Sequence, residues 1–260
     1  MKKILTLALA VLTTGSALAL DNEPKQGFTY MGFLGMTTSQ IRNTAYDGKV
    51  GGTAGMRLDY VLPKAHGTYL SAGVDWSMRG GKYDVIALEP TSLATSEATE
   101  FANLHYVEIP IHVGFRYNFS NEVGVYGEVG PYFAVGVGGK KKLSVDADGP
   151  QWRTLEDANT WGAFKKNKTV GHTNFQRWDA GLGFRVGAEY NKHYNLMLGC
   201  DWGFTDMYRD DYRDAVAVAA DAYAAAVAAA TGGTPITVPE VHKLSKAKNF
   251  NFALTFGYRF

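Results

Sequence analysis

Cysteine is almost absent from this sequence. The single cysteine, Cys200, excludes an internal disulfide and a metal site built from several thiolates. An excess of one charge is missing as well, because 26 Lys and Arg against 25 Asp and Glu leave a net charge of +1. Such a balance indicates neither nucleic acid nor another acidic macromolecule as a partner.

Long apolar runs are missing too. Beyond the N-terminal region, no run reaches about 18 strongly apolar residues, so we expect no ordinary transmembrane helix. The N-terminus has the pattern of a secretory signal: Lys2 and Lys3, an apolar run at 4–12 and a small-residue cleavage site at 17–19. We predict cleavage directly after that site, which makes residues 1–19 a signal peptide; a retained anchor is the alternative.

Alternation of apolar and polar residues, the period of a strand with one buried face, recurs along the rest of the chain. Most alternating segments are 11 to 17 residues long. Soluble strands average about five or six residues, whereas a tilted membrane-spanning strand needs about 9–11. Eight such segments occur, at 28–38, 51–62, 68–79, 104–117, 123–138, 174–190, 194–208 and 248–260.

The connections between these segments alternate strictly between short and long. Membrane barrels with short periplasmic turns and long external loops have this rhythm, and a soluble sandwich has no reason to produce it. The short connections are 63–67, 118–122 and 191–193. The long ones are 39–50, 80–103, 139–173 and 209–247.

The two faces of each segment differ sharply. Between 104 and 119, the odd positions carry Val, Ile, Phe and Tyr, while the even positions include Glu108, His112 and Arg116. Aromatic residues gather near the ends of the apolar faces, where an interfacial girdle is expected. Residues 20–260 therefore predict an all-β fold, an eight-stranded antiparallel transmembrane β-barrel in a bacterial outer membrane.

The last strand and a central block carry a family resemblance. The chain ends on Phe256, Tyr258 and Phe260, a pattern similar to the C-terminal strand that the barrel-assembly machinery recognises in outer-membrane barrels. The blocks at 106–111 (YVEIPI) and 125–132 (VYGEVGPY) resemble the PorT-like outer-membrane β-barrel family of Bacteroidota. The resemblance implies an eight-stranded barrel and assigns no catalytic residues.

Placing the polar parity inside the barrel predicts a charged lumen, with six arginines facing seven carboxylates. Eight strands enclose a space that side chains just fill, and buried charges are tolerated when they are paired. We therefore expect an interlocked polar core and no diffusional pore. Its members are Arg57, Asp59, Asp75, Arg79, Glu108, His112, Arg116, Glu128, Arg177, Asp179, Arg185, Glu189, Asp201 and Arg259.

The expected function is that of a structural or surface-interaction protein that acts through its external loops. A narrow porin or transporter of small or apolar solutes is the first alternative. A lipid-modifying enzyme or protease at the rim is the second, with His105 and His172 as its candidates; an acid–base set of Glu108, His112 and Arg116 is a further possibility. No nucleophile elbow, zinc-helix motif or phosphate loop occurs, so we assign no catalytic residue, metal or cofactor.

The long loops give the remaining expectations. An Ala-rich stretch at 215–230, with Asp214 as N-cap and Gly232 as stop, predicts a helix within loop 209–247. Aromatic residues of loop 139–173 favour a small core with that helix, or a site for an extracellular partner. Lysines 140–142 in the same loop are placed to meet lipopolysaccharide phosphates or to be solvated.

Two single residues interrupt the strand patterns. Pro110 removes a ladder donor inside segment 104–117, which predicts a bulge or weakened pairing there; a lateral opening for an apolar ligand is the alternative. Cys200 falls on the outward parity of segment 194–208, where a thiol is a small apolar side chain.

Overall fold

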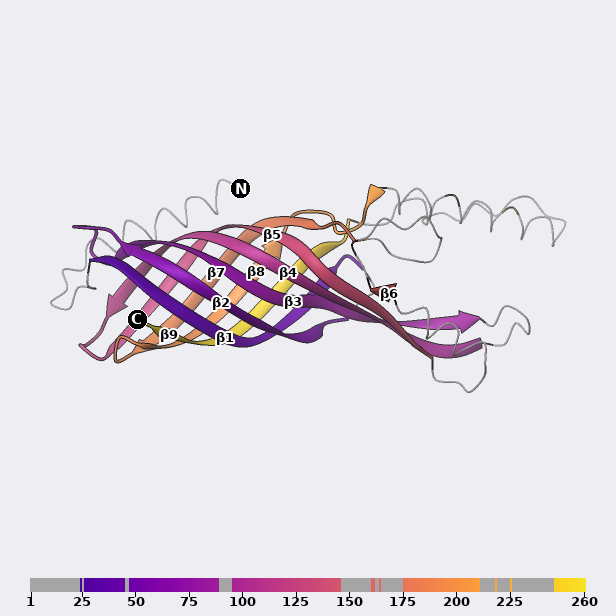
Figure 1. The fold of residues 1–260 in the computed structure, drawn as a ribbon, viewed down its shortest axis with the longest axis horizontal. Helices are drawn as coiled ribbons and strands as arrows, with labels where there is room; N and C mark the ends of the chain where they lie inside the picture. The colour runs from indigo at the N-terminus through magenta and orange to yellow at the C-terminus, as the bar shows by residue number, and fades with distance from the viewer. Residues whose placement is uncertain are drawn as a thin grey trace.

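The structure is a computed structural model that describes residues 24, 26–44, 47–88, 95–145, 160–161, 164, 175–210, 218, 225 and 246–260. Within these ranges the chain forms eight long antiparallel strands and one two-residue strand (Figure 1). They are β1 (Gly27–Arg42), β2 (Lys49–Val61), β3 (Thr68–Leu88), β4 (Thr95–Asn118), β5 (Val123–Val145), β6 (Thr160–Trp161), β7 (Trp178–Tyr190), β8 (Tyr194–Gly203) and β9 (Lys248–Arg259).

The eight long strands close into a barrel, so the predicted fold is confirmed. Each long strand pairs with its neighbours in sequence, and β1 pairs with β9 along a ladder that includes Leu34↔Phe256. The short strand β6 adds two residues to the outer part of β5. Closure leaves no unpaired edge within the barrel wall, which is the condition for strands to cross a membrane.

One end of the barrel carries three tight turns between consecutive strands. The turn between β7 and β8 uses Asn191 and Lys192 with φ of 52° and 62°. Two consecutive left-handed residues are the mark of the turn whose twist matches an antiparallel hairpin. Figure 1 shows the C-terminus at this same end, and β3, β4 and β5 running past the other strands at the opposite end.

Two strands are shorter than predicted. Strand β7 begins at 178 instead of 174, and β8 ends at 203 instead of 208. Phe175 and Tyr208 remain opposite each other in an isolated bridge, and their rings stack with centroids 6.2 Å apart. These residues leave the regular ladder because their rings turn over the barrel mouth.

Four strands are clearly longer than predicted: β1, which also includes residues 27 and 39–42, and to a greater extent β3, β4 and β5. The expected loop 80–103 is largely strand, because β3 and β4 stay paired out to Leu88↔Thr95, and β4 and β5 stay paired out to Ala98↔Val145. The β3–β4–β5 extension therefore projects beyond the barrel (Figure 1). Its sequence lacks clear alternation because a sheet outside the membrane has no lipid-facing side, while its backbone ladder needs no particular side chains.

The irregularity predicted at Pro110 is present as weakened pairing, and β4 has a second, unpredicted irregularity. Pairing between β3 and β4 lapses beside Pro110, between the pairs Ala72↔Ile111 and Asp75↔Glu108. The missing N–H of the proline accounts for this weakened pairing. The bulge itself lies farther along, where the register with β5 shifts between His105 and Tyr106.

The signal peptide predicted for residues 1–19 lies outside the described residues, as does His172. So does nearly all of the Ala-rich segment at 215–230, for which a helix remains a prediction. Across the part of the chain that the structure describes, no helix is long and apolar enough to cross a membrane.

The outer wall of the barrel is apolar and exposed. Leu34, Met56, Phe184 and Phe256 are representative, with exposed fractions of 67%, 71%, 52% and 52%. A continuous belt of this kind has no counterpart on an ordinary soluble monomer. Its place on the outward parity of every long strand is the pattern expected where lipid replaces water.

Apolar side chains also form buried clusters toward both ends of the barrel. At the end with the tight turns, a base cluster consists of Val61, Tyr69, Tyr126 and Met197. At the other end lies a mouth cluster of Ile41, Ala102, Leu104, Tyr106, Tyr132, Ala134, Phe164, Phe175, Met207, Tyr208 and Ala247. The mouth cluster includes Phe164 of loop 139–173 together with residues of the barrel, while a core between this loop and the helix of loop 209–247 stays a prediction.

Aromatic rings in these clusters lie across glycines of the neighbouring strand. Tyr126 pairs with Gly187, and a Cβ added to this glycine would lie 2.4 Å from the ring. Tyr69 covers Gly114 in the same way, with a corresponding distance of 2.3 Å. The absence of a side chain on one strand thus creates the space that a ring from the next strand fills.

This packing predicts that Gly187→Ala destabilises the barrel by about 1–3 kcal/mol, since the new methyl group overlaps a buried ring. Urea unfolding in detergent micelles measures the change. Gly127→Ala, one rung away on the outer face, is the matched control, because its nearest contacts are 3.8 Å away. Equal unfolding midpoints for the two variants would contradict the packing argument.

Candidate functional site in the barrel lumen

The inward parity of the strands gathers charged side chains in the lumen. Of the fourteen residues expected there, thirteen are buried, with exposed fractions between 1% and 6%. Arg177 is the exception. It precedes the first residue of β7 and its side chain is exposed, because strand parity does not extend past the end of the ladder. The lumen therefore holds five guanidinium groups and seven carboxyl groups, with His112 beside them.

The outer layer of the lumen is organised by Arg79 and Arg185. Arg79 forms ion pairs with Glu108 and, at 3.2 Å, with Asp179. Arg185 reaches Glu108 at 3.3 Å and Asp201 at 2.6 Å. Glu108 is thus shared by two arginines that approach from different strands, which ties β3, β4, β7 and β8 together across the lumen.

The middle layer is organised by Arg57 of β2. Its guanidinium group binds Asp75 at 2.7 Å and Glu128 at 2.5 Å. Glu128 also lies 3.0 Å from Nδ1 of His112 and accepts a hydrogen bond from the Tyr69 hydroxyl at 3.0 Å. One carboxylate on β5 therefore joins side chains from β2, β3 and β4.

The layer nearest the tight turns contains two arginines and two acids. Arg259 of the last strand binds Asp59 at 2.5 Å and Glu189 at 2.9 Å. Arg116 lies 3.1 Å from the same Asp59 carboxylate. Because β9 closes the barrel against β1, this layer links the end of the chain to strands from its first half.

Each of the five lumen arginines contacts at least two carboxylates, and each of the seven carboxylates contacts at least one arginine. The planar guanidinium group suits this task, since its five donors form a rigid fork. Aromatic rings cover the cations, with Arg79 5.4 Å from the ring centroids of both Tyr106 and Tyr132. Such contacts supplement charge pairing in a water-poor space.

Neutral side chains also bind the lumen carboxylates, and the alternation pattern alone does not single them out. Asn249 donates to Asp179 at 2.8 Å, and Asn251 donates to Asp201 at 3.2 Å. Both asparagines stand on the inward parity of the last strand. An uncharged amide does not need an oppositely charged partner, so the sequence gives no reason to single it out.

The interior is filled. A cavity of about 20 Å³ lies in the middle of the lumen, between residues that include Arg57, Glu108 and Asp201. A space of this size accommodates about one water molecule. At the end with the tight turns, a hollow of about 360 Å³ reaches Arg116, Glu189 and Arg259, so the tightly filled part of the lumen is its middle.

The structure does not assemble the acid–base sets considered from the sequence. Glu108, His112 and Arg116 belong to three different layers, and His112 faces Glu128 instead. His105 points outward and stacks on Trp76 with a centroid distance of 5.7 Å. Within the described ranges, no group of three or more His, Cys, Asp or Glu side chains is placed to hold a metal ion.

The middle layer generates a stability prediction. Arg57→Met leaves Asp75 and Glu128 without their shared cation, and breaking a buried ion pair costs about 3–5 kcal/mol. Urea unfolding in micelles should show a large fall in midpoint. The exposed Arg177→Met is the matched control and should change stability by less than about 0.5 kcal/mol. Adding Glu128→Gln to Arg57→Met should recover part of the loss; no recovery would contradict a direct coupling between the two side chains.

Solved structures that are similar to this chain include the following three. Ail, the attachment invasion locus protein of Yersinia pestis, has 13% sequence identity and a TM-score of 0.40, covering 91% of this chain and 100% of its own. Neisserial surface protein A has 10% identity and a TM-score of 0.38, covering 90% and 98%. The N-terminal β-barrel domain of Pseudomonas aeruginosa OprF has 6% identity and a TM-score of 0.34, covering 90% and 98%. Among curated proteins, none matches this chain.

A family profile gives the assignment. The profile described as an outer membrane protein beta-barrel domain matches residues 17–209, well over half of the sequence. The match agrees with the closed barrel, its apolar outer belt and its polar interior, and it places the protein in the bacterial outer membrane. The chain belongs to the outer membrane protein beta-barrel domain family.

Proposed function

We propose that this protein is a non-catalytic outer-membrane barrel that acts by surface interaction, with a lumen that stabilises the fold and carries no solute. The filled lumen is the observation that carries the proposal. Five arginines are locked between carboxylates from several strands, and the cavity among them has a volume of about 20 Å³. A transport path would require many of these ion pairs to separate in a low-dielectric interior, which is costly.

The outward activity is assigned to the β3–β4–β5 extension and to loops 139–173 and 209–247. The extension is held by a backbone ladder that continues from the membrane-spanning strands, so it presents a fixed surface to the medium. Rigid presentation lowers the entropy lost when a partner binds. An extracellular partner of these segments is therefore part of the proposal.

Lipopolysaccharide is the second proposed contact of this end. At the base of the extension, the register places Lys82 opposite Phe101 and Phe101 opposite Lys142. Lys140 and Lys141 of β5 lie beside these residues, beyond the apolar belt. Lys82 and lysines 140–142 together are called the lysine row. Lysines at this height stand where phosphate groups of the outer leaflet are expected, and each contributes about 1 kcal/mol to binding an anionic surface.

The end of β9 is proposed to serve as the assembly signal. Phe256, Tyr258 and Phe260 all point outward, with exposed fractions of 52%, 39% and 76%. They are therefore accessible to the barrel-assembly machinery before lipid covers them. The signal peptide and the narrower PorT-like assignment remain proposals of the same kind, supported by the sequence patterns alone.

The closed lumen predicts no steady conductance. The mature protein, refolded and inserted into planar bilayers, should give the baseline current over the range of applied voltages, while a wide porin inserted in the same bilayers serves as positive control. A stable open level that scales with the number of inserted molecules would favour the alternative of a narrow porin and overturn the proposed closed lumen.

The lysine row predicts a salt-dependent affinity for lipopolysaccharide. Replacing Lys140, Lys141 and Lys142 by Gln should weaken binding by up to about 3 kcal/mol at low ionic strength, at about 1 kcal/mol for each charge removed. Retention of the refolded barrel on immobilised lipopolysaccharide measures the effect. Gln at Lys64 and Lys192, exposed in turns at the opposite end, is the control. An equal loss in both variants would contradict the assignment.

A further inference from the structure

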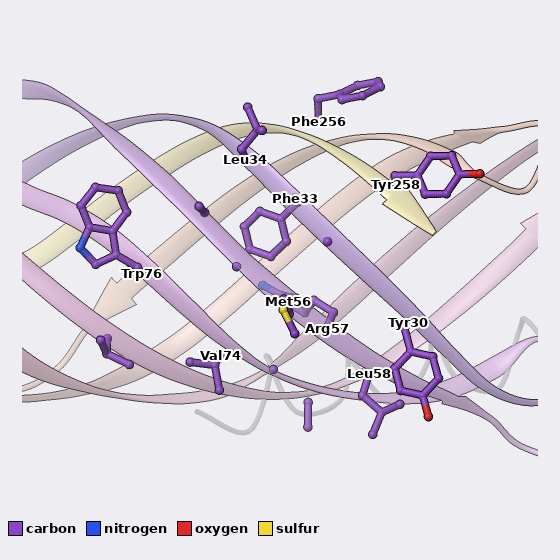
Figure 2. Close-up of a pocket in the computed structure, with 16 residues that line it drawn as sticks. Tyr30, Phe33, Leu34, Met56, Arg57, Leu58, Val74, Trp76, Phe256 and Tyr258 are labelled. Atoms are coloured by element: carbon purple, nitrogen blue, oxygen red, sulfur yellow. The ribbon is translucent and has the colours of Figure 1, made fainter. Parts of the chain in front are cut away.

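The outer wall of the barrel is hollowed at one place. An open groove of about 1030 Å³ runs over the outward face of β9, β1, β2 and β3 and reaches β4 (Figure 2). It lies on the lipid-facing belt, and its lining also includes Phe33 and Arg57, whose side chains belong to the lumen side of the wall. The groove is therefore separate from the extension that the proposed function uses.

Three small residues, Gly32, Ala54 and Ala72, lie on the outward parity within the groove. The exposed side chain of Met56 stands among them, because the register places it opposite Gly32 and opposite Val74. The wall itself is thin here. Gly55 has no Cβ, and one added to it would lie 2.7 Å from the ring of Phe33, which packs against it from the lumen side.

Large apolar side chains form the walls of the groove. Leu34 and Phe256 stand on one side, and Val74 and Leu58 on the other (Figure 2). Each of these four side chains is at least 38% exposed, so no other described part of the chain covers the hollow. The result is an apolar trough bounded by ridges, and not a smooth lipid-facing surface.

The groove has a polar end and an apolar end. Tyr30 and Tyr258 lie near the strand ends that carry the tight turns, and Trp76 lies at the far end of the groove, deeper along the barrel (Figure 2). Tight turns mark the periplasmic side of an outer-membrane barrel. Tyrosine hydroxyls prefer the membrane interface. The groove therefore runs from the periplasmic interface toward the middle of the bilayer.

We propose that this groove is a binding site for an acyl chain of a phospholipid from the periplasmic leaflet, which stays bound when the protein is extracted. The groove is continuous with the membrane-facing belt, and the surroundings of that belt are acyl chains. A chain seated in the trough contacts protein atoms on three sides, whereas a chain on the smooth belt contacts them on one. Closer contact over more atoms is the source of the additional affinity.

A second copy of the barrel fits this surface poorly. A two-fold contact pairs the same patch on both subunits. Two hollows would then face each other across the axis and leave a void, with the loss of contacts that a void brings. A flexible chain fills the trough without that penalty. The lipid headgroup would lie beside Tyr30 and Tyr258, at the level where the tyrosine hydroxyls meet water.

The test is native mass spectrometry of the full-length mature protein, extracted in mild detergent from vesicles of phosphatidylethanolamine. The wild type should retain one phospholipid. Filling the trough with Gly32→Leu and Ala54→Leu should lower the retained fraction roughly tenfold, which corresponds to losing contact with about two methylene groups. Gly32 tolerates the added side chain, since nothing lies within 4 Å of its Cβ position.

The matched control is Ala188→Leu, an exposed alanine on the outward face of β7, away from the groove. It should retain phospholipid as the wild type does, and all three proteins should show the same urea unfolding midpoint. Equal retention by all three would overturn the proposal. So would retention of lipopolysaccharide instead of phospholipid when both are supplied, or a dimer that the filled groove abolishes.

Discussion

The pairing of arginine with carboxylate inside a narrow barrel is the constraint on which the rest of this structure depends. Eight strands enclose a space too small for bulk water, so each cation must find its counter-ions among side chains. Arg57, Arg79 and Arg259 each bind acids from different strands, and each joins the strands within one layer of the lumen. The same pairing that holds the strands in place also fills the passage between them.

The alternation of polar and apolar residues made the membrane-spanning part predictable. Parity alone placed Glu108, His112 and Glu128 in the interior, because a one-residue slip would expose every charge to lipid. The same reasoning failed at Arg177, where the chain had already left the ladder. Which acid each arginine binds was not predictable, since that depends on the strand register and the tilt of the barrel.

The extension and the groove could not be read from the sequence for a different reason. Beyond the membrane, both sides of the sheet face water, so residues 82–88 carry no periodic signal although their backbone remains paired. The groove arises where the register sets small residues opposite large ones on the outward face: Gly32 opposite Met56, Ala54 opposite Leu34 and Ala72 opposite Leu58. Small residues on an alternating strand look like ordinary variation until the strands are aligned.

The continuity of β3 and β4 through the membrane and beyond it has a mechanical consequence. Strands of a closed barrel cross the bilayer at a tilt of about 35–45°, and the hairpin shares that tilt because, past the gap in pairing beside Pro110, the β3–β4 ladder continues out to Leu88↔Thr95. A partner bound at the outer end of the hairpin is therefore held to one side of the barrel axis, at a fixed distance from the membrane and in a fixed direction. A force applied at the outer end of the hairpin is then transmitted along the covalent backbone of β3 and β4 into the barrel wall.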